Sequence, residues 1–326
     1  MIILAIETSC DETAISVLKA NGGCKKLRFE ILSNVVASQI KIHSQWGGVV
    51  PSLAKREHQA NLIPVLEKTL KKSSLLISNF QFPISKQIQN SKFKILNSIL
   101  KREPELLRKF LRFLEEHQKP KIDLIAVTQG PGLEPALWTG INFAKALAIE
   151  WNKPLIAINH MEGHFFSVFL KKSFEFRASD FEFPAVVLLA SGGHTQLVLM
   201  KDFGDYKIIG ETLDDAAGEA FDKVARMLGL GYPGGPAIAA EAAKFPASGG
   251  KIPSGKIQFP RPLLHSKDFN FSFSGLKTAV LYKIKEIQKE IGSRIAPAGE
   301  IRSLIAYEFQ QAVIDVLLKK TIKAAK

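Results

Sequence analysis

The 326-residue chain is poor in cysteine, with Cys10 and Cys24 as its only two. Two cysteines cannot build a disulfide framework, and the apolar start at residues 1–6 is too short for the core of a secretion signal. No run reaches the roughly 18 apolar residues that are needed to cross a bilayer. These absences argue against a secreted or membrane-spanning protein, and we expect a cytoplasmic protein with no membrane partner.

Acidic residues are also scarce, since 31 Asp and Glu oppose 44 Lys and Arg and the net charge is +13. Much of the excess lies in residues 71–121, which hold twelve basic and only four acidic side chains. Residues 73–98 lack glycine and show no sustained apolar period, so we interpret residues 73–118 as an insertion that is dispensable for the fold. Two alternatives stay open for it: a solvated basic segment without a ligand, or a contact for a polyanion such as tRNA.

The length of the chain indicates two domains, since domains usually have about 100 to 200 residues. Strand-sized apolar runs alternate with segments of helical periodicity, which is typical of α/β proteins. A strand expected at residues 122–127, a glycine-containing turn and a helix expected at residues 135–151 show this alternation. We therefore predict an N-terminal α/β domain over residues 1–150, which contains the basic insertion, and a C-terminal α/β domain over residues 151–326.

Two predicted β-hairpins about 180 residues apart suggest that one α/β unit has been duplicated. The first joins residues 2–6 to residues 14–18 through a turn rich in acids and hydroxyls. The second joins residues 185–190 to residues 194–200 through Ser-Gly-Gly. Because hairpins are common and the two tips share no sequence, two unrelated hairpins remain the alternative.

His160 and His164 are candidate metal ligands, because a spacing of four places both imidazoles on one face of a helix. In the zinc-protease pattern H-E-x-x-H, a glutamate follows the first histidine directly. Here Glu162 is one place later, about 200° around the helix from His160. The spacing disfavours a peptidase, and two surface histidines without a metal remain an alternative.

Glycine-rich turns in the second half are candidate anion-binding sites. One lies at residues 191–193, and the others precede a helix expected near Pro236. Those others are Gly229, Gly231, Gly234 and Gly235. Glycine lets backbone N–H groups approach a phosphate closely, and a helix N-terminus favours negative charge. Neither run matches the Walker or Rossmann pattern, so ordinary turns remain the alternative.

Acidic residues between these turns have helical spacing. Asp215, Glu219 and Asp222 are placed to share one face of a helix. Such a face suits ribose hydroxyls or a cation, and a solvated acidic face is the equal alternative.

Taken in order, these segments resemble the TsaD family, the tRNA N6-threonylcarbamoyladenosine transferases once described as sialoglycoprotein endopeptidases. The resembling runs lie at residues 6–13, 47–51, 130–133, 160–164, 191–196, 214–223, 232–236 and 271–277. They span nearly the whole chain outside the basic insertion, and eight runs in the family's order are far more specific than any one. The resemblance implies an actin-like ATPase fold, in which two α/β domains are related by duplication and hold the ligand in a cleft between them.

The resemblance also implies an acyltransferase of tRNA modification. The reaction moves a threonylcarbamoyl group from threonylcarbamoyl-adenylate to N6 of adenosine 37 in tRNAs that read codons starting with A. The implied cofactors are one divalent metal ion, Fe²⁺ or Zn²⁺, and ATP or threonylcarbamoyl-adenylate as the nucleotide ligand. The implied partners are tRNA, a paralogous actin-like subunit and a small P-loop ATPase.

Site residues are carried over from the family by position in the matching runs. His160 and His164 match its metal-binding histidines, and Asp11 and Glu12 match an acidic pair with a catalytic or orienting role. The residues that match its nucleotide-binding positions are Leu189, Ala190, Ser191, Gly192, Gly193, Asp222 and Gly235.

One departure from the family concerns the last expected helix, at residues 303–326. Members of the family continue beyond it to an asparagine that contacts nucleotide and an aspartate that is the third metal ligand. We therefore expect the chain as given to be a portion that is inactive in transfer. A metallopeptidase of the glycoprotease type and a non-catalytic actin-like scaffold subunit are the alternative functions. The position of Glu162 disfavours the first, and the histidine pair disfavours the second.

Overall fold

The computed structural model describes residues 1–22, 27–78, 90–168, 170, 175–177, 181–245, 257–290 and 299–326. The chain forms two compact units, Met1–Phe181 and Glu182–Lys326. This division lies later than the predicted domain boundary at residues 150 and 151, because the strand that follows that boundary joins the first sheet. Among the described helices, none combines the length and the hydropathy that a bilayer span requires.

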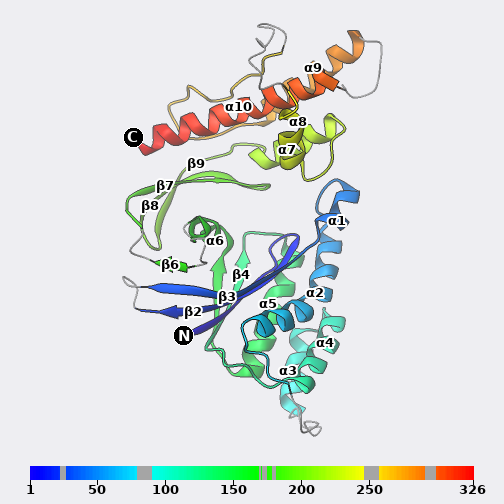
Figure 1. The fold of residues 1–326 in the computed structure, drawn as a ribbon, viewed down its shortest axis with the longest axis vertical. Coiled ribbons are helices and arrows are strands. Elements are labelled where there is room, and N and C mark those ends of the chain that lie inside the picture. Colours follow the sequence, from blue (N-terminus) through cyan, green and yellow to red (C-terminus); the bar gives the residue numbers. More distant parts are fainter. Residues whose placement is uncertain are drawn as a thin grey trace. The chain divides into compact units, whose positions relative to one another are not determined.

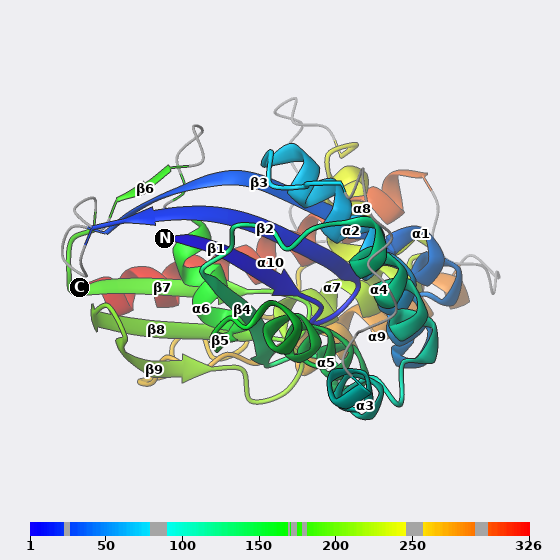
Figure 2. The same cartoon turned by 90° about the horizontal axis from the view of Figure 1, so that it is seen from below.

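The first unit is built on a six-stranded mixed sheet. In chain order it contains β1 (Ile2–Glu7), β2 (Glu12–Asn21), β3 (Arg28–Ser38), α1 (Ile40–His43), the short 3-10 helix η2 (Ser44–Trp46), α2 (Pro51–Lys72), α3 (Asn90–Ile99), α4 (Pro104–Glu116), β4 (Leu124–Gly130), α5 (Glu134–Trp151), β5 (Leu155–Asn159), α6 (His160–Ser167) and β6 (Glu175–Arg177). The strand order is β5-β4-β1-β2-β3-β6, and the central strands can be followed side by side in Figure 2.

The first predicted hairpin is confirmed. β1 and β2 pair antiparallel, with Ile2 opposite Lys19 and Glu7 opposite Ala14, while β1, β4 and β5 run parallel to one another. Side chains along β2 alternate between buried and partly exposed, as expected of a strand with one face on a core. The parallel arrangement brings the C-terminal ends of β1, β4 and β5 to one edge of the sheet.

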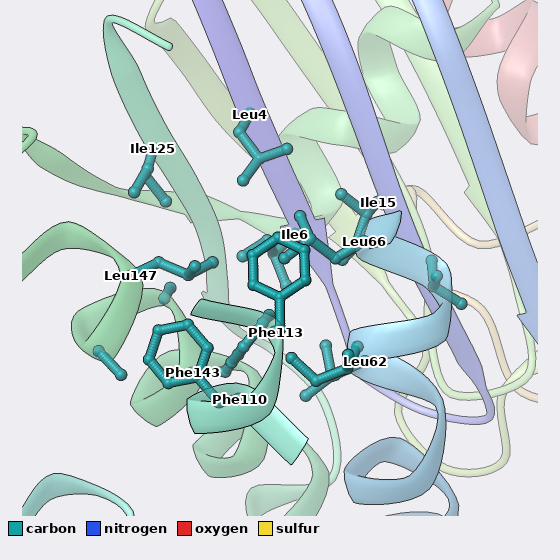
Figure 3. Close-up of a cluster of buried hydrophobic side chains, with 14 of the residues drawn as sticks. Leu4, Ile6, Ile15, Leu62, Leu66, Phe110, Phe113, Ile125, Phe143 and Leu147 are labelled. Carbon is teal, nitrogen blue, oxygen red and sulfur yellow. The ribbon is translucent and has the colours of Figure 1, made fainter. Parts of the chain in front are cut away.

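Helices α2, α4 and α5 lie together against one face of this sheet (Figure 1). Figure 3 shows how their apolar side chains meet those of the strands, with Leu4 and Ile6 of β1 facing Leu62 of α2 and Phe110 of α4. Both α2 and α4 begin at a proline, which suits the first helical turn because that turn has no intrahelical partner for the missing N–H.

The prediction that residues 73–118 are a dispensable insertion is contradicted for α4 and for the end of α3. The α4 side chains that are buried in the core are Leu106, Leu107, Phe110 and Phe113. The ring of Phe110 packs edge-on against Phe143 of α5, with 5.6 Å between centroids, and Leu96 and Leu100 are also buried. The amphipathic helix α4 was missed because residues 73–98, which precede it, are polar and show no sustained apolar period. Residues 79–89 of the predicted insertion lie outside the described residues.

The second unit holds an antiparallel sheet in the order β7-β8-β9, packed with helices. Its elements are β7 (Ala185–Ala190), β8 (Thr195–Asp202), β9 (Asp205–Glu211), α7 (Ala217–Met227), α8 (Gly234–Ala242), α9 (Ser274–Glu290) and α10 (Gly299–Ala325). The second predicted hairpin is confirmed, with Ala185 opposite Met200 and Ala190 opposite Thr195. Phe271, Phe273 and Phe309 are buried in a core of its own. Both units therefore confirm the predicted α/β class.

The burial of α4 generates a stability prediction. Phe110→Ala should lower the free energy of unfolding by about 3–5 kcal/mol, because it removes a fully buried ring and leaves a cavity beside Phe143. Chemical denaturation followed by circular dichroism measures the loss. Phe93→Ala on α3 is the matched control, since Phe93 is 41% exposed and its loss should cost less than about 0.5 kcal/mol. Equal effects of the two substitutions would contradict the role given to α4.

Candidate functional site

The two candidate metal ligands lie on α6, directly after β5. Asn159 caps this helix, since its side-chain oxygen accepts a hydrogen bond of 2.8 Å from the backbone N–H of Met161. The Nε2 atoms of His160 and His164 are 3.0 Å apart. Two nitrogens that each lie about 2.0–2.1 Å from one metal ion are separated by a similar distance. The spacing is that of a hydrogen bond between the two rings, and it is also compatible with two ligands of a single ion.

Glu7, at the end of β1, orients the first of these histidines. Nδ1 of His160 lies 3.2 Å from Oε2 of Glu7 and 3.3 Å from Oγ of Ser9. A carboxylate at Nδ1 keeps the proton on that nitrogen and leaves the Nε2 lone pair for a metal, as in many metal sites with a carboxylate behind the histidine. This observation fits a divalent ion at the pair, and sequence reasoning missed Glu7.

The carboxylate of Glu7 is held in its ionised form. Burial raises its pKa, but hydrogen bonds from His160, the backbone N–H of Ser9 and the hydroxyl of Thr128 outweigh the burial and lower the pKa to about 2. Thr128 comes from β4, so the parallel pairing of β1 with β4 supplies one of these donors. The signal in the sequence was a lone carboxylate at the end of an otherwise apolar strand.

Asp11 lies in the turn between β1 and β2, Glu12 is the first residue of β2, and Ser9 of the same turn contacts His160. The carboxylate of Glu12 accepts a hydrogen bond of 3.2 Å from Ser38. Burial, followed by the charge of Asp11, raises the pKa of Glu12. Burial likewise raises the pKa of the Cys10 thiol to about 12, which excludes a thiolate nucleophile near neutral pH.

The buried side chain of His58 forms hydrogen bonds to this acidic turn. The sequence analysis did not identify His58. Nε2 of His58 in α2 donates to the carbonyl of Cys10 at 3.0 Å. Nδ1 then accepts from the hydroxyl of Thr13 at 2.7 Å. Burial lowers the pKa of His58 below its ordinary value of 6.5, so the imidazole is neutral and its two nitrogens have opposite roles. The histidine thus ties both sides of the turn to α2.

In the second unit, the turn at residues 191–193 joins β7 to β8. The backbone N–H of Ser191 donates to the carbonyl of His194 at 2.8 Å, and Ser191 Oγ accepts from the N–H of His194 at 3.1 Å. A β-carbon at Gly192, Gly193 or Gly235 would meet no atom within 4 Å. The fold itself therefore does not require glycine at these three positions, which leaves the backbone there open to a ligand.

At Gly218 and Gly234, by contrast, the fold does require glycine. A β-carbon at Gly218 would lie 2.5 Å from the carbonyl oxygen of Ser191, and one at Gly234 would lie 2.5 Å from Cα of Asp222. The N–H of Gly234 also donates to the Asp222 carboxylate at 2.7 Å. Asp222 therefore holds the first turn of α8, and burial raises its pKa.

Asp215 does not share a helix face with Glu219 and Asp222, because α7 begins only at Ala217. Asp215 precedes α7 and its two oxygens are each 2.8 Å from an ammonium group, one of Lys223 and one of Lys277. Glu219 pairs with Lys223 at 2.7 Å. Burial raises the pKa of Asp215, but the hydrogen bonds from both lysines outweigh it and lower the pKa. These ion pairs neutralise the acids within the unit.

Asp214 has a structural role that the sequence did not reveal. Its carboxylate accepts hydrogen bonds from the backbone N–H groups of Phe273 and Ser274 and from the hydroxyls of Ser272 and Ser274, and it thereby caps α9. Burial raises its pKa, but these four donors outweigh burial and lower the pKa to about 2. Ser274 is the first residue of α9.

Within the described ranges, a different group of three side chains also has metal-ligand spacing. The donor atoms of Glu67, Glu116 and His117 lie within 4.8 Å of one another, on α2 and at the end of α4. Glu116 already pairs with Arg112 at 2.7 Å. This group includes neither His160 nor His164.

Comparison with known proteins decides the family. The family model TsaD, described as tRNA N6-adenosine threonylcarbamoyltransferase, matches residues 30–81 and 104–326. This chain belongs to the TsaD family. The tRNA N6-adenosine threonylcarbamoyltransferase of Thermosipho africanus is 41% identical over 326 residues, which are 100% of this chain and 77% of the relative. Those of Syntrophomonas wolfei and Bacillus subtilis are 43% and 41% identical and align with 99% and 100% of this chain and with 75% and 74% of their own lengths.

The mixed α/β architecture confirms the predicted α/β class, and membership in the TsaD family identifies the chain as an acyltransferase-family protein. A solved structure of YeaZ from Pseudomonas aeruginosa aligns with 64% of this chain and 65% of its own, at 11% identity and a TM-score of 0.29, a similarity too low to support an argument. The TsaD match leaves residues 82–103 unassigned, a shorter segment than the predicted insertion.

The carboxylate behind the histidine pair generates a prediction on metal affinity. Glu7→Gln should weaken Zn²⁺ binding about 10- to 100-fold, because the charge that orients and polarises His160 is lost. Calorimetric titration with Zn²⁺ measures this. The matched control is Glu30→Gln, which removes an exposed charge on β3 of the same unit and should leave affinity unchanged. An unchanged affinity in Glu7→Gln would show that the carboxylate has no part in the metal site.

The neutral His58 generates a prediction on pH dependence. The pKa of His58 is lower in the folded than in the unfolded chain, so its contribution to stability is complete above pH 6.5 and is lost as the pH falls below that value. The unfolding midpoint of the parent in urea should decline from pH 7 to pH 5, and His58→Gln should make this decline shallower. His117→Gln, which alters a partly exposed histidine of the same unit, should leave the decline unchanged. A parallel decline in His58→Gln would contradict a neutral, buried His58.

Proposed function

We propose that this chain, in place of the inactivity expected from its sequence alone, transfers a threonylcarbamoyl group from threonylcarbamoyl-adenylate to N6 of adenosine 37 in tRNAs that read codons starting with A. Family membership supports the reaction class, and the names of the relatives do not favour a peptidase or a scaffold subunit. The observation that carries the proposal is the histidine pair, with Nε2 atoms 3.0 Å apart and a carboxylate behind His160. A scaffold would need neither feature.

Side chains of the first unit would hold the metal and move a proton. His160 and His164 would bind a divalent ion, Fe²⁺ or Zn²⁺, with Glu7 fixing the orientation of His160. A bound ion would supply Lewis-acid polarisation of the carbamoyl carbonyl. Glu12 is suited to take a proton, because burial and the charge of Asp11 raise its pKa towards the working pH.

The bond changes in transfer are simple to assign. N6 of the adenine attacks the carbamoyl carbonyl carbon, a C–N bond forms, and the bond between that carbon and the phosphate oxygen breaks. AMP leaves with the electron pair of that bond, and the proton of N6 passes to the carboxylate of Glu12. No covalent enzyme intermediate is required, which agrees with the protonated Cys10 thiol.

The second unit would bind the nucleotide, as ATP or as threonylcarbamoyl-adenylate. The open backbone at Gly192, Gly193 and Gly235 supports this role, because N–H groups there can approach a phosphate without a side chain in between. Gly235 also lies in the first turn of α8, where the helix dipole favours an anion. Leu189 and Ala190 are the last residues of β7, which leads into the turn at residues 191–193. The carboxylate of Asp222 accepts a hydrogen bond from the N–H of Gly234 at the start of α8.

The remaining partners follow from the same proposal. We infer that tRNA is the macromolecular substrate, that an actin-like paralogous subunit assembles with this chain, and that a small P-loop ATPase participates. A tRNA substrate also supports a cytoplasmic location.

The test is incorporation of labelled threonine from threonylcarbamoyl-adenylate into an unmodified tRNA transcript, with the two partner proteins present. His160→Ala should reduce the rate at least about 100-fold, because one of the two imidazole ligands is lost. His117→Ala is the matched control for loss of a histidine in the same unit and should retain the parent rate. A transcript with guanosine at position 37 should accept no label. Absence of transfer by the parent, or full activity of His160→Ala, would contradict the proposed function.

A further inference from the structure

The first unit contains a cavity of about 530 Å³. The residues that line it include neither of the two candidate histidines and none of the acidic turn. Its walls come from the C-terminal end of α3, the turn that follows, the first turns of α5 and Lys55 of α2. We call it the α3–α5 cavity. Its size falls within the range of about 300–1,000 Å³ that is usual for ligand pockets.

Two exposed cations stand at the rim of the α3–α5 cavity. Lys101 and Arg102 occupy the turn between α3 and α4, and within the described parts of the chain neither forms an ion pair. The third cation, Lys55, is already engaged, because its Nζ lies 3.6 Å from the buried carboxylate of Glu103. Asn142 donates to the other oxygen of Glu103 at 3.3 Å. The charge of Glu103 is thus neutralised locally, and positive charge remains available at the rim.

An exposed tryptophan lines the same cavity. Trp138 of α5 is 48% exposed, whereas Trp151 of the same helix is 2% exposed and belongs to the core. Nζ of Lys145 lies 5.3 Å from the Trp138 ring centroid, so a cation already rests on the indole. One carboxylate, Glu134, also lines the cavity and is exposed. An exposed indole beside unpaired cations is the combination with which proteins bind unpaired nucleotides.

The two cations at the rim, unlike Lys55, belong to a segment that the TsaD family model does not match. That segment is residues 82–103, and it includes Lys101 and Arg102, whereas Trp138 lies in the matched part. Buried Leu96 and Leu100 fix the end of α3 in the core and therefore fix the position of the turn. The cavity is thus a built feature of this chain, held by the same packing that contradicted a dispensable insertion.

We propose that the α3–α5 cavity binds an unpaired nucleotide of the tRNA substrate, with its base stacked on Trp138 and its phosphate in contact with Lys101 and Arg102. The proposal rests on the proposed function for the identity of the RNA. A base within a duplex has no free face for an indole, so the nucleotide comes from a loop or an end. An acidic peptide would use the two cations and gain little from the indole.

The first experiment uses tryptophan fluorescence of the full chain. In a Trp46→Phe background, Trp138 is the only exposed tryptophan, because Trp46 is 66% exposed and Trp151 is buried. Titration with an unmodified tRNA transcript should quench the emission, and the further substitution Trp138→Phe should abolish the quenching. Trp138→Ala should weaken binding about 5- to 150-fold, as expected for loss of one stacked base. Trp138→Phe should retain most of the affinity, and unchanged melting temperatures would show that both variants are folded.

The second experiment separates specific phosphate contacts from overall charge. Lys101→Gln with Arg102→Gln should weaken tRNA binding and lower the slope of log Kd against log salt by about 1.4, the value for two contacts to a single strand. The matched control, Lys119→Gln with Lys121→Gln, removes the same charge from exposed positions of the same unit outside the cavity lining. Its slope should equal that of the parent.

Several outcomes would overturn the proposal. They are unchanged tRNA affinity in Trp138→Ala, equal losses in the two double variants, and quenching of Trp138 by polyglutamate as strong as by tRNA. Failure of the proposed function is distinguishable, because an unstructured oligoribonucleotide tests the cavity without any transfer. If that probe quenches Trp138 in a chain that transfers no label, the proposed transfer reaction is contradicted and the proposed nucleotide binding in the α3–α5 cavity is supported. Full transfer with no effect of the cavity variants on binding would overturn the cavity alone.

Discussion

The hydrogen bond between Glu7 and His160 links the order of the strands to the chemistry of the site. Glu7 ends β1, and His160 begins the helix after β5, so the two meet only because β1, β4 and β5 run parallel and end at one edge of the sheet. Thr128 at the end of β4 completes the set of donors. A carboxylate that is kept ionised in this way is a fixed negative charge, and it can orient an imidazole without being consumed in the reaction.

The parts of the fold that were predicted correctly depend on neighbours in the sequence. The hairpin of β1 and β2 and the i, i+4 histidine pair are local patterns, and each is present in the structure. Glu7 and His58 were missed because their partners lie far away along the chain, 153 residues for Glu7 and 48 for His58. Spacing in a sequence carries no information about such contacts.

The error over α4 has a physical reason too. The average composition of residues 73–118 is polar and basic. The packing of α4 nevertheless depends only on its apolar face, which is formed by Phe110 and Phe113 together with two leucines. Arg108 and Arg112, which lie between them in the sequence, are exposed. A similar error concerned Asp215, whose helical spacing to Asp222 suggested a shared face, while ion pairs with Lys223 and Lys277 had already satisfied it.

Close packing at two glycines has a consequence for the proposed nucleotide-binding turn. The backbone of Gly218 touches the turn that precedes it, and the backbone of Gly234 touches Asp222 farther along α7. The turn, α7 and the start of α8 are therefore in close backbone contact, with no room for a side chain between them. A side chain larger than hydrogen at Gly218 would displace the turn at residues 191–193 as well as α7, and one at Gly234 would displace α7 as well as α8. The position of the proposed nucleotide-binding turn thus depends on a glycine about 25 residues farther along the chain.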